Sequence, residues 1–209
     1  MPMPPTVSSL SVVIIITLFL LLSCDNNHYY PGNITILPVV SAMKLVVQRV
    51  KSASVSVDNT QISTIGPGIL ALVGLHVDDT TTDLQYCVKR LLNIKLWENE
   101  SGAPWRKHVK QLNYEILCVS QFTLYGTLSK KYQPDYKLAM KSESARSMYS
   151  QFLEMLREGY TESKILDGEF GKMMDVMLVN DGPVTLIIDS REDVNGGKDS
   201  TVVDVDSSA

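Results

Sequence analysis

Apolar and polar residues alternate over a short stretch that begins at Met43, and this alternation predicts β-strands. The strand-like segments are KLVVQRV (44–50), ASVSVD (53–58), QISTI (61–65) and GILALVGLHV (68–77). Turn-forming residues separate the later segments, with Asp58-Asn59 after the second and Gly66-Pro67-Gly68 after the third. We therefore expect a β-rich opening of four strands.

The hydrophobic period then changes from two to between three and four, which predicts two helices. In the first, between Thr82 and Leu92, apolar residues recur on one face. In the second, which starts at Ser142, an apolar stripe runs from Ala145 to Leu156, and Gly159 is expected to end the helix. Each helix therefore has one face suited to packing on a sheet.

Further strand-like segments lie between and after these helices. They are NIKLW (93–97), YEILCVSQFTLY (114–125), KMMDVMLV (172–179) and VTLIID (184–189). The second of these is apolar but ends in polar residues. Asn180-Asp181-Gly182, between the last two segments, fits a hairpin turn. Together the segments predict an α/β fold that is β-rich and layered, with sheets packed against two main helices.

The two ends of the chain differ from the middle. Residues 1–42 contain no Lys or Arg, and the apolar run 10–22 resembles the hydrophobic part of a signal peptide. The run is shorter than the roughly 20 residues that span a bilayer, and the usual positive start is missing. We expect an N-terminal extension over 1–42, one domain over 43–192 and a disordered acidic tail over 193–209. The alternative is that residues 10–22 form a real targeting segment.

The charge of the middle region is balanced overall but unevenly placed. Between Lys89 and Arg146 there are eleven Lys or Arg against five Asp or Glu. A modest basic face of this kind suits the end of a polyanion better than a long duplex, because each phosphate contact requires a cation. A merely solvated surface is the alternative explanation.

Several kinds of site are not indicated. The three cysteines are widely spaced, and Cys87 and Cys118 lie in apolar segments, so neither a disulfide framework nor a zinc site is expected. The three histidines have no metal-ligand spacing. Glycine-rich phosphate loops and the nucleophile motif of serine hydrolases are missing too. We expect no metal and no cofactor.

Two segments carry candidate chemistry: SQFTL (120–124) and NDGPVT (180–185). Each has a purely structural explanation, as a polar strand end and as a turn. The Gly-Pro pair favours a functional explanation as well. A Gly-Pro bond can be cis, and glycine leaves the carbonyl groups open to close approach, so this pair could form a rigid pocket wall.

The segment from Met43 to about Glu192 resembles the D-aminoacyl-tRNA deacylases. The resemblance is carried by MKLVVQRV, SQFTL, PDYKLAM and NDGPVT, in the order and at nearly the spacing of that family. It implies the fold of the family, a homodimer, and hydrolysis of D-aminoacyl-tRNA with rejection of the L-form. Glycyl-tRNA mischarged on tRNA(Ala) is implied as a second substrate.

The resemblance also assigns residues. Ser120, Gln121, Phe122, Thr123 and Leu124 occupy the first motif, with the first four at the catalytic centre and Leu124 contacting the substrate. Gly182 and Pro183 occupy the second, whose cis peptide enters the neighbouring subunit's pocket in that family. Arg49 matches the arginine that holds the Gly-Pro carbonyl groups. The loop 128–134 departs from the family by about one extra residue and by the lack of its usual glycine.

The implied mechanism needs little acid-base chemistry from the protein. No His or Asp stands beside Thr123 in the sequence, which argues against an activated threonine nucleophile. The ribose 2′-hydroxyl of the tRNA would assist, and main-chain amides near Phe122 and Thr123 would hold the oxyanion. A cytoplasmic location follows from such a substrate. The alternatives are another ester hydrolase with Thr123 as nucleophile, and a secreted or membrane-anchored binding protein.

Overall fold

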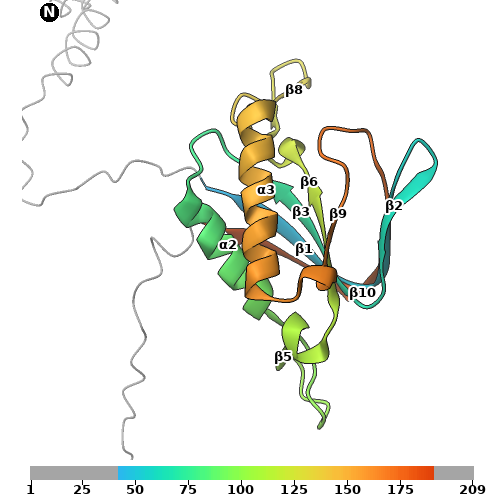
Figure 1. The fold of residues 1–209 in the computed structure, drawn as a ribbon. Helices are drawn as coiled ribbons and strands as arrows, with labels where there is room; N and C mark the ends of the chain where they lie inside the picture. The colour runs from blue at the N-terminus through green and yellow to red at the C-terminus, as the bar shows by residue number, and fades with distance from the viewer. Residues whose placement is uncertain (1–41, 191–209) are drawn as a thin grey trace, which may run out of the picture. The chain divides into compact units, whose positions relative to one another are not determined.

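The computed structural model describes residues 42–190 (Figure 1). The extension expected over 1–42, including the apolar run 10–22, and the tail expected over 193–209 lie outside these residues, except for Ala42. No helix within 42–190 is both long enough and apolar enough to cross a membrane.

One six-stranded sheet forms the centre of the fold. Its strands are β1 (Lys44–Val57), β2 (Thr60–Ile65), β3 (Gly68–Gly74), β6 (Glu115–Ser120), β9 (Ile165–Asp167) and β10 (Asp175–Asp189). The strand order is β10-β1-β3-β6-β9, and β2 pairs with β1 beside this path. Pairing is antiparallel except between β3 and β6 and between β6 and β9, which are parallel. β10 is therefore an edge strand.

The remaining elements within residues 42–190 are short pairs of strands, two α-helices and three turns of 3-10 helix. The pairs are β4 (Lys95–Trp97) with β5 (Lys107–His108) and β7 (Thr127–Leu128) with β8 (Pro134–Asp135). The α-helices are α2 (Thr81–Asn93) and α3 (Ser142–Gly159), and the 3-10 helices are η1 (Val109–Leu112), η2 (Phe122–Tyr125) and η3 (Glu162–Lys164). The α-helices lie side by side in front of the sheet (Figure 1).

The sheet curls because β1 is long enough to serve two neighbours. Residues 44–50 of β1 pair with β3, and residues 53–57 pair with β2. The hydroxyl of Ser63 in β2 donates a hydrogen bond to the carbonyl oxygen of Asp167 in β9, at the far edge of the path. This bond brings the two sides together, so that the sheet is nearly closed.

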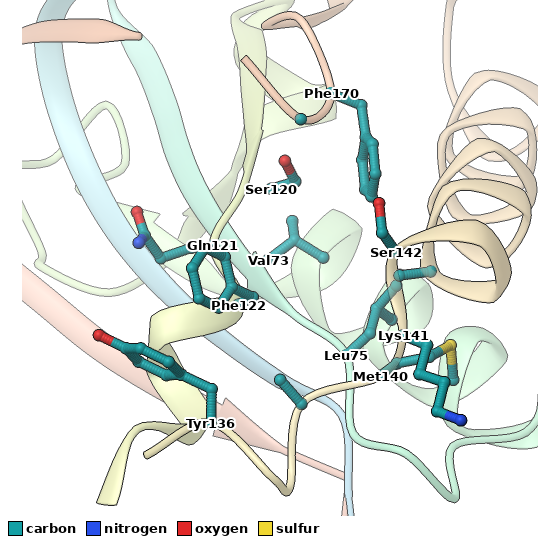
Figure 2. A pocket seen from close by; sticks show the side chains of 13 residues that line it. Val73, Leu75, Ser120, Gln121, Phe122, Tyr136, Met140, Lys141, Ser142 and Phe170 are labelled. Atoms are coloured by element: carbon teal, nitrogen blue, oxygen red, sulfur yellow. The ribbon is translucent and has the colours of Figure 1, made fainter. Parts of the chain in front are cut away.

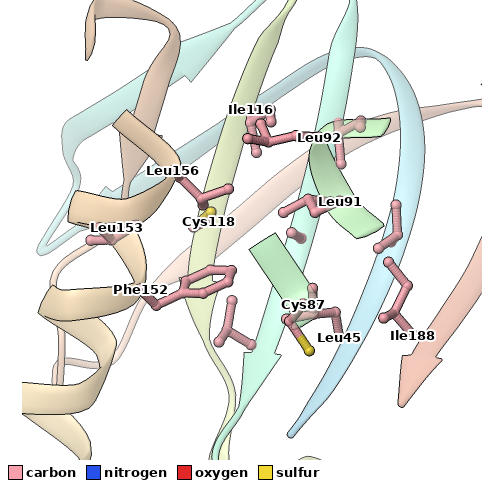
Figure 3. Close-up of a cluster of buried hydrophobic side chains, with 14 of the residues drawn as sticks. Leu45, Cys87, Leu91, Leu92, Ile116, Cys118, Phe152, Leu153, Leu156 and Ile188 are labelled. Atoms are coloured by element: carbon pink, nitrogen blue, oxygen red, sulfur yellow. The ribbon is translucent and has the colours of Figure 1, made fainter. Parts of the chain in front are cut away.

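Two clusters of buried side chains fill the two faces of the sheet. The larger lies between the sheet and the helices, where Phe152 and Leu156 of α3 and Leu91 of α2 meet Ile116 and Cys118 of β6 (Figure 3). The smaller cluster lies on the other face, inside the curled sheet. Its buried residues are Val50, Ala53, Val55, Ile65, Leu70, Leu117 and Val119. Alternate residues of β3 and β6 contribute to opposite clusters, as the pleat of a strand requires.

The structure confirms the expected β-rich α/β fold with two main helices and corrects three details. The first two strand-like segments form the single strand β1. The SQFTLY half of segment 114–125 does not continue the strand, because the chain turns into η2 after Ser120. The last two segments form the single strand β10, both halves of which pair with β1. A hairpin at Asn180-Asp181-Gly182 is therefore wrong, because the chain does not reverse there.

Candidate active site

A cavity of about 510 Å³ opens where β3 and β6 end (Figure 2). Its walls come from both strands, from the segment before α3, from the start of α3 and from the loop after β9. The lining residues are Val73, Leu75, Ser120, Gln121, Phe122, Tyr136, Ala139, Met140, Lys141, Ser142, Ala145, Phe170 and Gly171. Three of the predicted site residues, Ser120, Gln121 and Phe122, are among them.

The turn into η2 exposes main-chain amides beside this cavity. The Gln121 amide still donates to the Val73 carbonyl oxygen at 2.7 Å, which completes the strand pairing, and the Leu124 amide donates back to Gln121. Between them, in the described part of the chain, the amides of Phe122 and Thr123 donate to no protein acceptor. This follows from the start of a helix, whose first amides have no partner within it.

The side chains of the SQFTL segment point in different directions. Phe122 is 57% exposed and packs edge-on against Tyr136, with ring centroids 4.9 Å apart (Figure 2). The Thr123 hydroxyl accepts a hydrogen bond from the Gln121 side-chain amide. Leu124 lies against Gly74, where an added Cβ would be 3.0 Å from the Leu124 Cβ. Thr123 and Leu124 do not line the cavity.

The opposite wall contains residues that the sequence did not single out. Phe170 stands beside α3, with the Arg146 guanidinium 4.8 Å from its ring centroid. Lys141 precedes α3 and supplies a positive charge at the rim. Tyr136, Met140 and the PDYKLAM segment were indicated only by family resemblance. Phe170 follows the short strand β9, and no pattern in the sequence marks it.

The cavity has no pair of ionisable groups suited to acid-base catalysis. Asp79, which is buried, is not among the lining residues, and its carboxylate accepts a hydrogen bond from the His76 amide at 2.6 Å. Burial, opposed by that hydrogen bond and reinforced by Asp83, Asp189 and Asp78, raises the pKa of Asp79 to about 7. Burial also raises the pKa of the Cys118 thiol far above its usual range. Neither residue lines the cavity.

No group of three or more His, Cys, Asp or Glu side chains within 42–190 is arranged to hold a metal ion.

The Gly182–Pro183 segment forms a wide bulge in β10. Asn180 pairs with Val50 and Thr185 pairs with Gln48, so four residues of β10, 181–184, stand opposite the single residue Arg49. The Gly182–Pro183 bond is cis, and Gly182 has a φ of 116° that favours glycine. Both residues are exposed. The bulge therefore projects from the edge of the sheet.

Side-chain contacts of Arg49 and Asn180 hold this bulge in place. The Asn180 side-chain amide donates to the carbonyl oxygens of Arg49 at 3.0 Å and Val184 at 3.2 Å. Arg49 donates to the Leu96 carbonyl oxygen, and its Nε lies 2.9 Å from an Asp181 carboxylate oxygen. The Nε contact is an ion pair without hydrogen-bond alignment. The bulge is thus tied to both β1 and β4.

The predicted site residues therefore fall into two separate groups. The first group lies at the end of β6, where Ser120, Gln121 and Phe122 line the cavity, whereas Arg49, Gly182 and Pro183 take no part in lining it. The structure brings Arg49 and Gly182 together, since an added Cβ on Gly182 would lie 3.2 Å from Arg49 Nη2.

Comparison with solved structures places this fold in a class. A structure described as a probable eukaryotic D-amino acid tRNA deacylase superposes with a TM-score of 0.63, at 17% identity, over 71% of this chain and 99% of that chain. The chain therefore has the fold of a tRNA deacylase. A second structure, described as the c-Myc DNA Unwinding Element Binding Protein, superposes with a TM-score of 0.67 at 49% identity, over 69% and 97% of the two chains.

Sequence comparison then identifies the family. The model of the family described as D-Tyr-tRNA(Tyr) deacylase matches residues 46–189. A D-aminoacyl-tRNA deacylase of Drosophila melanogaster is 49% identical over 150 residues, which are 72% of this chain and 94% of the relative. The chain belongs to the D-Tyr-tRNA(Tyr) deacylase family.

Proposed function

We propose that this chain hydrolyses the ester bond between a D-amino acid and the 3′-terminal adenosine of tRNA. The observation that carries the proposal is the turn after Ser120, which places two unpaired main-chain amides beside a cavity of about 510 Å³. Membership of the deacylase family supports it. An ester hydrolase needs donors of this kind, because negative charge develops on the carbonyl oxygen during attack.

The cavity suits the terminal adenosine in its size and in its lining. Phe122 and Tyr136 form an aromatic wall, and Phe170 stands on the other side. Aromatic side chains stack on nucleobases and tolerate any base. Lys141 at the rim is placed to contact a phosphate of the tRNA end. We assign the adenine to the aromatic part of the cavity and the ester to the side of Ser120, Gln121 and Phe122.

The hydrolysis itself requires only water and the substrate's own hydroxyl group. Water attacks the ester carbonyl carbon, the bond to the 3′-oxygen breaks, and that oxygen takes up a proton, which leaves a free amino acid and intact tRNA. The 2′-hydroxyl is positioned next to the reacting group and relays the proton. The amides of Phe122 and Thr123 hold the oxyanion. The Thr123 hydroxyl accepts a hydrogen bond from the Gln121 side-chain amide, and within residues 42–190 it is bonded to no carboxylate or imidazole that could activate it.

The rejection of L-amino acids is assigned to Gly182 and Pro183 of a second copy of the chain. In one copy these residues are exposed and project away from the edge strand β10. The same strand exposes Met177, Val179, Leu186 and Ile187, an apolar surface suited to a homodimer. In the dimer the bulge of one subunit enters the cavity of the other and forms a rigid wall that clashes with an L-side chain.

Two further properties follow from the proposed reaction. Glycine has no side chain to clash with the wall, so glycyl-tRNA mischarged on tRNA(Ala) is a second substrate. Aminoacyl-tRNA is used for translation in the cytoplasm, so we infer that the enzyme is located there. No step of this mechanism calls for a metal ion or cofactor.

The decisive experiment is deacylation of matched D- and L-tyrosyl-tRNA, followed by D-tyrosyl-tRNA that ends in 2′-deoxyadenosine. We expect rapid hydrolysis of the D-ester, none of the L-ester, and a severe loss with the deoxy substrate. Equal hydrolysis of both enantiomers would reject the chiral assignment. Full activity on the deoxy substrate would instead favour the rival mechanism in which Thr123 is the nucleophile.

A further inference from the structure

A basic hairpin lies at the other end of the fold from the cavity. It comprises β4, the loop 98–106, β5 and the start of η1, through Lys110. In Figure 1 β5 and β8 mark opposite ends of the domain, and β8 belongs to the segment beside the cavity. Strand β6 links the two ends, because it starts after the hairpin at Glu115 and finishes at Ser120. The hairpin is therefore about one strand length, roughly 20 Å, from its own cavity.

Positive charge gathers on the basic hairpin. Lys95 of β4 is paired with His108 of β5 across the hairpin. Burial first, and then the charges of Lys110, Lys95 and Lys107, lower the pKa of His108. Lys107 is paired with Glu100 at 2.6 Å. Lys95, Arg106 and Lys110 form no ion pair with any residue of 42–190, and Glu98 is the one other acid in the hairpin.

An exposed aromatic ring accompanies these cations. Trp105 is 51% exposed and adopts a φ of 59°, a conformation uncommon for a bulky residue. By contrast, Trp97 on the same hairpin packs edge-on against Tyr114, 5.4 Å between centroids. Trp97 thus serves the scaffold, whereas Trp105 presents its ring to solvent next to Arg106. Cations with an interleaved aromatic ring are the usual features of a surface that binds a single-stranded nucleic acid.

The hairpin is fixed to the Gly182–Pro183 bulge of the same chain. Arg49 donates to the carbonyl oxygen of Leu96 in β4 and pairs with Asp181 in the bulge. Arg49 therefore links the two features directly. If the bulge of one subunit enters the cavity of the other, as proposed above, the basic hairpin is carried to the rim of that second cavity.

We propose that the basic hairpin of one subunit binds the sugar-phosphate backbone at the acceptor end of the tRNA whose terminal adenosine occupies the other subunit's cavity. This inference rests on the proposed function and adds a binding surface in trans. Lys95, Arg106 and Lys110 contact phosphates, and Trp105 stacks on an unpaired nucleotide next to the terminal adenosine. Each active centre is then built from both chains, through the bulge and through the hairpin.

The first test compares substrates of different length. We expect the triple variant Lys95→Gln, Arg106→Gln and Lys110→Gln to raise KM for D-tyrosyl-tRNA about tenfold with kcat unchanged, and to reduce the salt dependence of binding by roughly two to three phosphate contacts. Its kinetics on the short ester D-tyrosyl-adenosine should equal those of the wild type. The control is Lys89→Gln, an exposed lysine on α2, which should leave both substrates unaffected.

The aromatic contact is tested separately. Trp105→Ala should raise KM for the tRNA ester, and Trp105→Phe should restore it, because a phenyl ring still stacks. A variant that changed kcat on D-tyrosyl-adenosine would instead report an indirect effect on the cavity and would count against the inference. Melting temperatures of all variants establish that each is folded.

Mixed dimers test whether the hairpin acts in trans. One chain carries Ala139→Trp, which fills the cavity, and its partner keeps an open cavity. When the triple hairpin variant is placed on the filled chain, KM for tRNA should rise. When it is placed on the open chain, KM should remain normal. The reverse result would overturn the arrangement in trans.

The outcomes separate this inference from the function itself. A wild-type protein that fails to hydrolyse D-tyrosyl-tRNA would remove the proposed function and with it the hairpin's role. Normal hydrolysis with an unchanged KM in the triple variant would reject the hairpin alone. Duplex DNA can be added as a competitor of tRNA binding. If the triple variant weakened the binding of duplex DNA but left the binding of tRNA unchanged, the inference would be rejected and the surface would be assigned to another nucleic acid.

Discussion

The cavity at the end of β6 and the bulge in β10 differ in how completely one chain builds them. The cavity is enclosed by β3, β6, α3 and the loop after β9, and its polar turn follows a fully buried stretch of strand. The bulge lies on an edge strand, is exposed, and is held by contacts from Arg49 and Asn180. One region is therefore a space built within the chain, whereas the other is a projection from the edge of the sheet.

This difference teaches that the position of a residue in one chain does not reveal where it works. Ordering a projection costs conformational entropy, and residues 181–184 add no pairing between β10 and β1 in return. In the proposed dimer, the bulge of one copy would supply a wall to the cavity of the other.

The largest effect is expected from separating the two copies. Met177→Lys together with Ile187→Lys places charges on exposed apolar positions of β10, so the monomer should fold but the dimer should not form. We expect the preference for D- over L-tyrosyl-tRNA, or the activity itself, to fall about a hundredfold, because the positioning wall is lost. Light scattering and deacylation rates measure the two properties on the same sample.

A matched control uses an exposed apolar residue elsewhere. Ile62→Lys on β2 adds a similar charge outside β10 and should leave both assembly and selectivity intact. A fully active and fully selective monomer at the assay concentration would show that the bulge acts within its own chain, or not at all.

A smaller effect is expected from loosening the bulge without separating the copies. Arg49→Lys keeps the charge but cannot reach Leu96 and Asp181 with one planar group. We expect selectivity to fall about tenfold, as for the loss of one hydrogen bond to a charged group. The ratio of D- to L-deacylation rates measures it. Asp181→Asn should cost less, since the bond to Leu96 remains, and equal losses would contradict this division of roles.

Within the cavity region, Thr123→Ala should have a modest effect of about threefold, because its hydroxyl accepts from Gln121 and does not line the cavity. Thr123→Ser keeps that acceptor and should match the wild type. Single-turnover hydrolysis of D-tyrosyl-tRNA is the measurement. A loss of about 10⁴-fold or more, as on removal of a covalent nucleophile, would reinstate the rival mechanism.

Much of the fold could be predicted because hydrophobic spacing reports local structure. Helix α3 starts at Ser142 and ends at Gly159, at the residues that its stripe and terminal glycine indicated. The errors arose where polar residues follow an apolar run. SQFTLY has the composition of a strand, and only the tertiary setting, in which Gln121 completes the pairing with Val73, turns it into η2.

The candidate site could be predicted only in part. Asn180-Asp181-Gly182 has the chemistry of a hairpin turn, and no local pattern distinguishes a turn from a bulge whose flanks both pair with β1. Phe170 lies outside any motif, because its position depends on how distant segments pack. The roles of Thr123, Leu124 and Pro183 remain predictions.

The smallest effect is expected from removing residues 1–42. Met43 is buried, and its amide donates to the Ser190 hydroxyl at 3.1 Å, which in turn donates to the Asp83 carboxylate at 2.6 Å. A chain that starts at Met43 places an α-ammonium group here, and the nearby carboxylate favours that charge. The same truncation removes the Ala42 carbonyl oxygen and with it the hydrogen bond that this oxygen accepts from the Tyr125 hydroxyl.

These opposing changes lie at the start of β1, at the other end of that strand's pairing with β3 from Arg49. We therefore expect the chain that starts at Met43 to dimerise and to deacylate D-tyrosyl-tRNA within about twofold of the full chain, or better. A chain that starts at Ala42 keeps the carbonyl group and is the matched control. If both shortened chains lost selectivity, residues 1–41 would be a third functional region, one that acts on the bulge or on the cavity.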